Sequence, residues 1–161
     1  MAGGLKAVEA RRPVERARDA APVAGASTDR PVVLFDGVCN MCNGLAAFVI
    51  ARDPAPGRFR FAPLQSASGQ WVLRRHGLRT DDFDTFVLVE GERAFVRSTA
   101  ALRLLRRLGL PWSLLSAVLT LVPRPLRDAA YGWVARNRYA WFGKRDACMV
   151  PAPDVRSRFL A

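Results

Sequence analysis

Short apolar runs alternate with longer amphipathic stretches between residues 31 and 109. The run 32–35, Val-Val-Leu-Phe, stops at Asp-Gly, which is typical of a buried strand that enters a tight turn. Residues 58–62 alternate between polar and apolar side chains, as in a half-buried strand. The predicted order is strand, helix, strand, helix, strand, strand, helix, over residues 32–35, 43–52, 58–62, 65–76, 85–89, 94–96 and 98–108.

Two further helices are predicted beyond Gly109. Residues 111–122 form an apolar stretch that opens with proline and is far shorter than the roughly 20 residues needed to span a bilayer. Residues 126–137 continue as an amphipathic helix. Its apolar face is predicted to consist of Leu126, Ala129, Ala130, Trp133 and Val134. We expect the two helices to pack as a hairpin on the sheet or around the rim of an active site. The alternative is an exposed apolar face that docks on a membrane or a partner.

Residues 1–30 differ in composition from the rest of the 161-residue chain. They are rich in Ala, Arg and Pro and contain almost no large apolar side chains, so they lack the apolar core of a signal peptide. The expected organisation is therefore a disordered leader at 1–30, a core at 31–109 and a C-terminal helical extension at 110–161, packed on the core.

Cys39-Asn40-Met41-Cys42 stands where the first strand ends and the first helix begins. Backbone N–H groups at a helix N-terminus favour a thiolate, most of all on the first cysteine. The chain has three cysteines, too few for a secreted disulfide framework, so we predict a reducing, cytoplasmic setting. A Cys-x-x-Cys pair at this point in this order of elements indicates a thioredoxin-like α/β fold, with a central mixed four-stranded sheet flanked by helices.

The cysteine spacing predicts thiol-disulfide exchange. Cys39 is the candidate nucleophile and Cys42 the resolving thiol, while Asn40 and Met41 between them contribute to the reduction potential. Two alternatives stay open at this point. The thiols could be inert, or they could bind zinc together with Cys148 and His76, although structural zinc sites usually contain two close-spaced ligand pairs. Cys148 is otherwise interpreted as an additional redox thiol or as a buried apolar residue.

Asp36 precedes Cys39 by three residues. Its carboxylate could accept or relay the proton of Cys42, or it could hold the loop by accepting backbone N–H bonds. Turn formation before glycine is the simpler explanation for this residue. Gly37 is expected to supply a turn conformation that is forbidden to larger residues.

The net charge of +11 is concentrated in one segment, since residues 97–145 contain ten basic residues against one acidic residue. Such a field attracts anionic lipid, nucleic acid or an acidic protein surface, and it is equally compatible with a solvated arginine-rich surface. No alternation of basic and aromatic residues resembles a nucleic-acid module, so we expect no specific nucleic-acid binding.

Several separated motifs resemble the DCC family of predicted thiol-disulfide oxidoreductases, which is named for its aspartate and two cysteines. The resemblance covers about residues 31–160. Its motifs are residues 34–43, 58–65, 97–102, 122–128, 137–139 and 141–143. It implies a thiol-disulfide oxidoreductase without a cofactor, acting on a disulfide-bearing protein or a low-molecular-weight thiol, and it favours a functional role for Asp36.

The chain departs from thioredoxin relatives at one point. Those relatives carry a cis-proline just before the third strand, facing the cysteine pair, whereas this chain has Asp-Phe-Asp-Thr at residues 82–85. Thr85 and its neighbours are therefore expected to form that surface in a different way.

Overall fold

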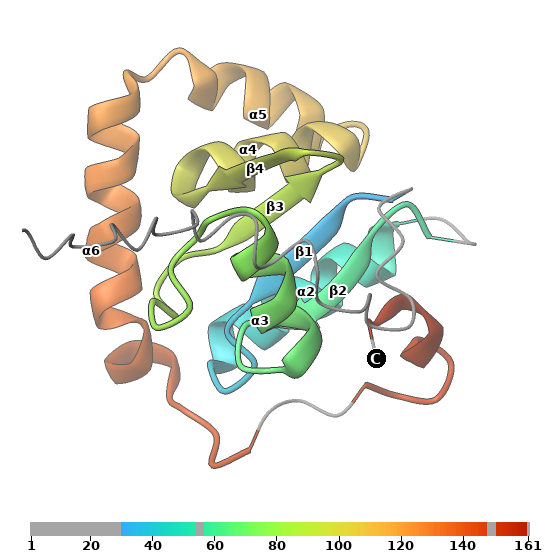
Figure 1. Ribbon diagram of the computed structural model, residues 1–161. Coiled ribbons are helices and arrows are strands. Elements are labelled where there is room, and N and C mark those ends of the chain that lie inside the picture. The colour runs from blue at the N-terminus through green and yellow to red at the C-terminus, as the bar shows by residue number, and fades with distance from the viewer. Residues whose placement is uncertain (1–29, 54–56, 148–150, 161) are drawn as a thin grey trace, which may run out of the picture.

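A four-stranded mixed sheet forms the centre of the computed structural model, which describes residues 30–53, 57–147 and 151–160 (Figure 1). The strands lie in the order β2-β1-β3-β4. β1 pairs with β2 in parallel and with β3 antiparallel, and β4 pairs antiparallel with β3. The strand bounds are Val32–Phe35 for β1, Arg60–Pro63 for β2, Val87–Glu90 for β3 and Arg93–Val96 for β4.

Helices cover both faces of this sheet. Their bounds are Asn40–Arg52 for α2, Ala67–Arg75 for α3, Arg97–Arg107 for α4, Trp112–Thr120 for α5 and Arg124–Phe142 for α6, with a short 3-10 helix η1 at Arg156–Arg158. Side chains on β1 alternate between two apolar clusters. Val32 and Leu34 pack with α3, whereas Val33 and Phe35 pack with α2 and α4. Burial on both faces explains why β1 is a continuous apolar run.

The sheet confirms the predicted α/β class and the predicted mixed four-stranded architecture, and it is consistent with a thioredoxin-like fold. The crossover from β1 through α2 to β2 produces the parallel pair, and the β3–β4 hairpin adds the antiparallel strands. Gly77 follows α3 with a φ of 65°, as a helix stop in the left-handed region. Residues 1–29 lie outside the described residues, and the division at residues 30 and 109 stays a prediction.

The C-terminal helices confirm the predicted extension, but α6 presents the opposite face to the core. Leu126 and Trp133 are 61% and 56% exposed, and Ala129 and Ala130 are exposed too, so the expected packing was wrong for these four residues, while Val134 lines the cavity beside Cys42. Polar side chains on the other side of α6 have partners inside the molecule, and this is the physical reason. Tyr131 accepts a hydrogen bond from the Phe86 backbone N–H (2.8 Å), and Arg138 forms a buried ion pair with Asp36.

Candidate active site

The cysteine pair lies at the junction of β1 and α2, as predicted. Cys39 is the N-cap of α2 and its Sγ accepts a hydrogen bond from the Cys42 backbone N–H (3.5 Å). The first turn of α2 contains no acidic residue, so the partial positive charge of the helix end acts on this sulfur without opposition from within the helix. The helix begins at Asn40, three residues earlier than predicted, because the cysteine itself supplies the cap.

A short segment after α6 covers Cys39. We call residues 142–145 the strap. The Arg145 N–H donates to the Val38 carbonyl (2.7 Å), and Lys144 forms an isolated β-bridge with Cys39. The Asn40 side chain holds both ends of the strap: its Nδ2 donates to the Phe142 carbonyl and its Oδ1 accepts from Arg145 Nε, each at 2.9 Å. As a result, the Cys39 side chain is fully buried.

Cys42 is half-buried and faces a small cavity of about 70 Å³. Met41 and Thr85 also line this cavity, so the structure brings these two predicted site residues to the cysteine pair. The pKa of Cys42 is raised to about 12, first by burial and then by its hydrogen bond to Cys39 and the charges of Cys39 and Asp36, against the opposing effect of Arg138. The two thiols therefore differ in exposure and in environment.

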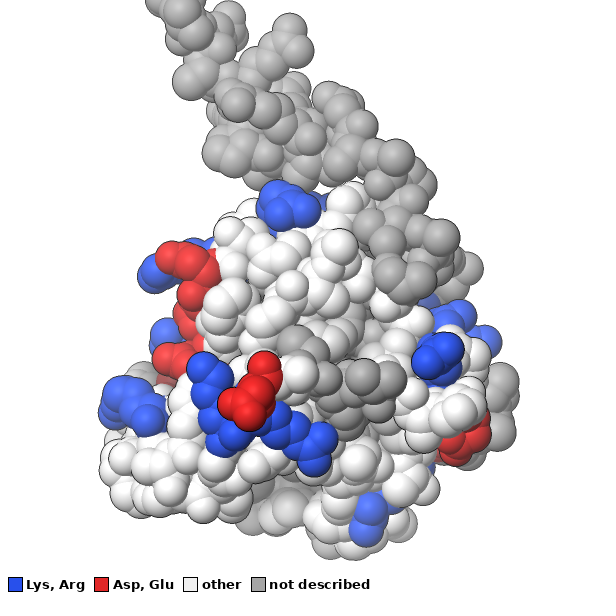
Figure 2. Space-filling view, turned by 90° about the horizontal axis from the view of Figure 1, so that it is seen from below, with Lys and Arg blue, Asp and Glu red and all other residues white. Residues whose placement is uncertain are grey.

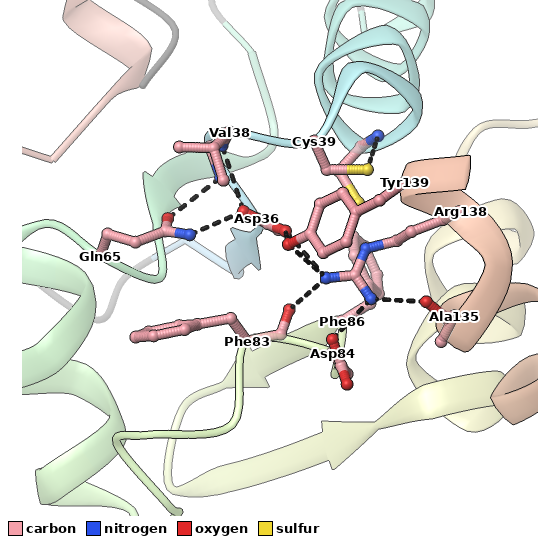
Figure 3. Close-up of polar contacts among 12 residues, drawn as sticks. Asp36, Val38, Cys39, Gln65, Phe83, Asp84, Phe86, Ala135, Arg138 and Tyr139 are labelled. Atoms are coloured by element: carbon pink, nitrogen blue, oxygen red, sulfur yellow. Dashed lines mark hydrogen bonds and ion pairs between the residues drawn. The ribbon is translucent and has the colours of Figure 1, made fainter. Parts of the chain in front are cut away.

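The carboxylate of Asp36 accepts four hydrogen bonds and is 2% exposed (Figure 3). One oxygen accepts from the Val38 backbone N–H (3.1 Å) and from Gln65 Nε2 (2.6 Å). The other accepts from Arg138 Nη2 (2.8 Å) and from the Tyr139 hydroxyl. The bond to Val38 is the loop-holding contact considered from the sequence.

Arg138 reaches the site from α6 and is itself 2% exposed. Besides Asp36, its guanidinium donates to Asp84 (2.8 Å), to the Phe83 carbonyl (3.2 Å) and to the Ala135 carbonyl (2.8 Å). Figure 3 shows the guanidinium lying between Asp36 and the loop before β3. One side chain thus connects the loop before the cysteines, the loop before β3 and helix α6.

These contacts fix the charge states of the network. Burial would raise the pKa of Asp36, but the hydrogen bonds from Tyr139, Arg138 and Gln65 outweigh burial and the pKa is lowered. Burial would lower the pKa of Arg138, but its hydrogen bonds to the two aspartates raise it. Burial and the hydrogen bond to Asp36 raise the pKa of Tyr139. Near neutral pH the site therefore contains a carboxylate, a guanidinium and a neutral phenol.

Gly37 is held from two sides by polar side chains. Its N–H donates to Gln65 Oε1 (3.1 Å), and its carbonyl accepts from Asn43 Nδ2 (2.9 Å). The turn conformation expected here is not found, because Gly37 is absent from the described glycines with positive φ, which are Gly57, Gly77, Gly91, Gly109 and Gly143. The two hydrogen bonds hold the backbone of the turn that precedes Cys39.

The described residues offer no group of three or more His, Cys, Asp or Glu side chains that could hold a metal ion. His76 lies beside Glu92, just past the carboxyl end of β3. Because β3 runs antiparallel to β1, this end of the sheet is the one farther from the cysteines. Burial lowers the pKa of His76 against the opposing charge of Glu92. Cys148, the third ligand considered for zinc, lies outside the described residues.

Sequence reasoning missed the partners of Asp36. Arg138 lies just after the predicted end of the last helix, in a segment rich in arginine, and nothing in its spacing separates it from arginines on the surface. Gln65, Arg138 and Tyr139 all fall within motifs that carry the family resemblance, without an assigned role. That resemblance is the signal that could have identified them.

The fold and the site define an α/β protein of thioredoxin-like architecture with a Cys-x-x-Cys pair at its first strand–helix junction. Comparison with known sequences identifies the group more closely. The sequence model of the DCC1-like thiol-disulfide oxidoreductase family matches residues 33–144, and the chain belongs to this family. The match spans the site from Asp36 to Lys144, and Arg145 of the strap lies just beyond it.

Two curated relatives support the assignment. The chain is 49% identical over 129 residues to the uncharacterized protein YuxK of Bacillus subtilis, covering 80% of this chain and 93% of that protein. It is 45% identical over 120 residues to the chloroplastic DCC family protein At1g52590 of Arabidopsis thaliana, covering 74% of this chain and 69% of that protein. No solved structure matches the chain. Within the described part of the chain, every helix is too short or too polar to cross a membrane.

Proposed function

We propose that this protein is a thiol-disulfide oxidoreductase in which Cys39 is the nucleophile and Cys42 the resolving thiol. The observation that carries the proposal is the asymmetry of the pair. The Cys39 sulfur caps α2 and accepts a backbone N–H, whereas the pKa of Cys42 is raised to about 12. Cys42 is therefore held protonated, and the sulfur at the helix end is the candidate nucleophile.

The reaction proceeds by two sulfur exchanges. The Cys39 thiolate attacks one sulfur of a substrate disulfide, that S–S bond breaks, and the departing thiolate leaves with the bonding electron pair. Cys42 then gives its proton to the departing thiolate and attacks Cys39 Sγ, which releases the second substrate thiolate. The substrate disulfide gains two electrons, and the Cys39–Cys42 dithiol becomes a disulfide. A thiol donor, protein or low-molecular-weight, restores the dithiol.

The environment of Cys42 determines that Cys39 reacts first and Cys42 second. Part of the increase in its pKa comes from the negative charge of Cys39. Once Cys39 forms a mixed disulfide, that charge is gone and the pKa of Cys42 falls. The resolving thiol is thus activated only after the first exchange has taken place.

Asp36 acts as a positioning residue in this proposal. Its carboxylate is saturated by four donors and its pKa is lowered, so it stays ionised and has no free lone pair in reach of the cysteines. It fixes the loop through the Val38 N–H, and its charge helps to keep Cys42 protonated before the first exchange. This assigns Asp36 the loop-holding role in preference to the proton relay.

Substrate access requires movement of the strap, because Cys39 is fully buried beneath it. The Asn40 contacts that hold the strap are exposed hydrogen bonds, which contribute little individually. A partner that pairs with the backbone of residues 38–40 replaces the strap and reaches the sulfur. A disulfide-bearing protein or a low-molecular-weight thiol fits this description, and Thr85 contributes to the adjoining cavity in place of a cis-proline. We infer a cytoplasmic setting from the composition of the chain.

The competing candidate is a non-enzymatic interaction module whose cysteines are structural. The burial of Cys39 and the exposed apolar side chains of α5 and α6 favour it. The two candidates differ in what Cys39→Ser does, since this variant loses exchange activity if the protein is an oxidoreductase and keeps partner binding if it is a module.

Trapping of the mixed disulfide tests the proposal. In a Cys148→Ser background, Cys42→Ser should form a lasting adduct with glutathione disulfide on Cys39, visible as one added glutathione by intact mass. Cys39→Ser in the same background is the matched control and should form none at Cys42. If the adduct forms on Cys42 and not on Cys39, the assignment of the nucleophile is reversed. If neither variant forms one, the oxidoreductase proposal fails.

A further inference from the structure

Helix α5 has its polar and apolar sides reversed relative to a core-packed helix. Leu114, Val118 and Leu121 point to solvent, with exposed fractions of 61%, 54% and 83%. We call these three residues the apolar face of α5. They are separated by four and three positions, so they lie on one side of the helix. The described large hydrophobic residues that are exposed all fall between Leu110 and Phe142.

The inward side of α5 carries hydroxyl groups in place of leucines. Ser116 is 3% exposed and donates to the Leu102 carbonyl of α4 (2.8 Å). Thr120 donates to the Ser116 carbonyl (2.7 Å). The contact between Ser116 and α4 therefore fixes the orientation of α5, and rotation of the helix would leave the Ser116 hydroxyl without its partner. An apolar surface held outward in this way indicates a binding surface.

An arginine-lined groove of about 470 Å³ runs along the inward side of α5, between α4 and α6. Ser116 and Thr120 line it from α5. Its charged side chains are four arginines and one glutamate, namely Arg103, Arg106, Arg107, Arg127 and Glu90. The groove and the apolar face are thus on two sides of one helix, separated by no more than a helix diameter of about 10 Å.

Two of these arginines have no acidic partner within the described structure. Glu90 pairs with Arg103 (2.6 Å) and Arg107 (2.8 Å), which uses its single charge. Arg106 and Arg127 form no ion pair among the described residues, and the Nε of Arg127 is buried without a hydrogen-bond partner. A buried guanidinium N–H without a partner, as at Arg127 Nε, beside the exposed and unpaired Arg106 favours an anionic ligand, and phosphate oxygens match guanidinium geometry.

We infer that α5 and the arginine groove bind the surface of an anionic phospholipid bilayer. A headgroup phosphate occupies the groove beside Arg106 and Arg127, and the apolar face of α5 enters the boundary between headgroups and acyl chains. The protein would then be peripheral, in accord with the absence of a membrane-spanning helix from the described residues.

Charge distinguishes this occupant from the alternatives. A second copy related by two-fold symmetry would bring a second set of unpaired arginines against the first, which is repulsive. A protein interface centre is enriched in aromatic residues, whereas the apolar face of α5 is purely aliphatic. On the side of the molecule away from α5, Figure 2 shows acidic side chains beside several of the basic ones.

Flotation of the full chain with lipid vesicles tests the inference. The protein should float with vesicles that contain phosphatidylglycerol and stay behind with phosphatidylcholine alone, and binding should weaken with added salt. Arg106→Gln and Arg127→Gln should each weaken binding about fivefold. Leu114→Gln together with Leu121→Gln should reduce it to background. Arg156→Gln, an exposed arginine on η1, is the matched control and should bind like the unchanged chain.

Three results would overturn the inference. The first is equal binding to both kinds of vesicle, or none to either. The second is inorganic phosphate that binds in an Arg106- and Arg127-dependent way, by calorimetry, while vesicles do not bind. The third is a dimer in sedimentation that the paired leucine substitutions dissociate, with no vesicle binding. Circular dichroism shows whether each variant is folded, and the salt dependence of the unchanged chain gives a reading that needs no variant.

Discussion

The turn between β1 and α2 and the helix α5 both depart from the rule that apolar side chains are buried and charged side chains are exposed. The turn buries charged side chains, and α5 exposes apolar ones. At the turn, Asp36 and its partner Arg138 from α6 are charged and almost completely buried, whereas on α5 Leu114 and Leu121 are apolar and exposed. The comparison shows that the available hydrogen-bond partners, and not hydropathy alone, determine which side chains are buried. The aspartate is buried because four donors reach it, and the leucines are exposed because Ser116 on the other side of α5 binds α4. Departures of this kind tend to occur at functional sites.

The two regions also differ in what they contribute to stability. A buried ion pair is costly to break, because removing one partner leaves the other charge uncompensated in a low-dielectric interior. An exposed apolar side chain is in contact with water in both the folded and the unfolded state, so replacing it changes the free energy of unfolding very little. Substitutions in the two regions should therefore have effects of very different size.

Arg138→Met should have the largest effect. It leaves the buried carboxylate of Asp36 without its guanidinium and should reduce the free energy of unfolding by about 3–5 kcal/mol, measured by urea denaturation. Arg136→Met removes an exposed arginine from the same helix and should change it by less than about 0.5 kcal/mol. Adding Asp36→Asn to Arg138→Met should recover part of the loss. Equal losses for the two arginine variants would contradict a buried, charged network.

The second-largest effect should be a loss of stability at low pH as the Asp36 carboxylate becomes protonated. Its folded-state pKa is lowered from an ordinary value of about 3.9, so its contribution is fully present above about pH 5 and is lost as the pH falls below about 4 and through the lowered folded-state pKa. In this window the folded protein should lose up to about 1.4 kcal/mol per pH unit through this one group. Asp36→Asn should remove that part of the slope, whereas Asp154→Asn, at an exposed position, should leave it. An unchanged slope in Asp36→Asn would contradict the lowered pKa.

Asn40→Ala should have a smaller effect, on access to Cys39. It removes both side-chain hydrogen bonds to the strap, each of which contributes about 0.5–1.5 kcal/mol. Iodoacetamide should therefore alkylate Cys39 several-fold to tens-fold faster, measured by mass in a background of Cys42→Ser and Cys148→Ser. Asn137→Ala removes an exposed amide hydrogen bond within α6 and should not change the rate. A rate that is equal in the two variants would mean that the strap does not limit access.

Leu126→Gln should have the smallest effect on stability, within about 0.5 kcal/mol, because this side chain is 61% exposed. Leu104→Ala, at a buried position of α4, should instead cost about 2–5 kcal/mol. Thermal or urea unfolding of the two variants makes the comparison. A large loss for Leu126→Gln would show that the outer side of the C-terminal helices packs against the core after all.

Local patterns were sufficient to predict the sheet. The apolar run of β1, the hairpin residues around Gly91 and the stop at Gly77 each follow from the preferences of a few neighbouring residues. The position of the cysteines at the end of β1 followed in the same way. These features depend on interactions between residues that are close together in the chain, so they can be predicted from the sequence alone.

The network behind the cysteines depends on contacts between residues about 100 positions apart, and no local pattern contains them. Arg138 and Asp36 are an example, and so are Asn40 and the strap. Hydrophobic periodicity predicted α6 as a helix, but it assigned the inward face by hydropathy. Tyr131 and Arg138 face inward because their hydrogen-bond partners are there, so that assignment was wrong.

The reduction potential of the Cys39–Cys42 pair tests the central claim most directly. The purified chain, with Cys148→Ser to leave one pair, is equilibrated in buffers of reduced and oxidised glutathione or dithiothreitol, and free thiols are trapped and counted by mass. We predict a single reversible two-electron transition between dithiol and disulfide, which Cys39→Ser abolishes. Thiols that stay reduced across the whole range, or a transition that persists without Cys39, would contradict the account.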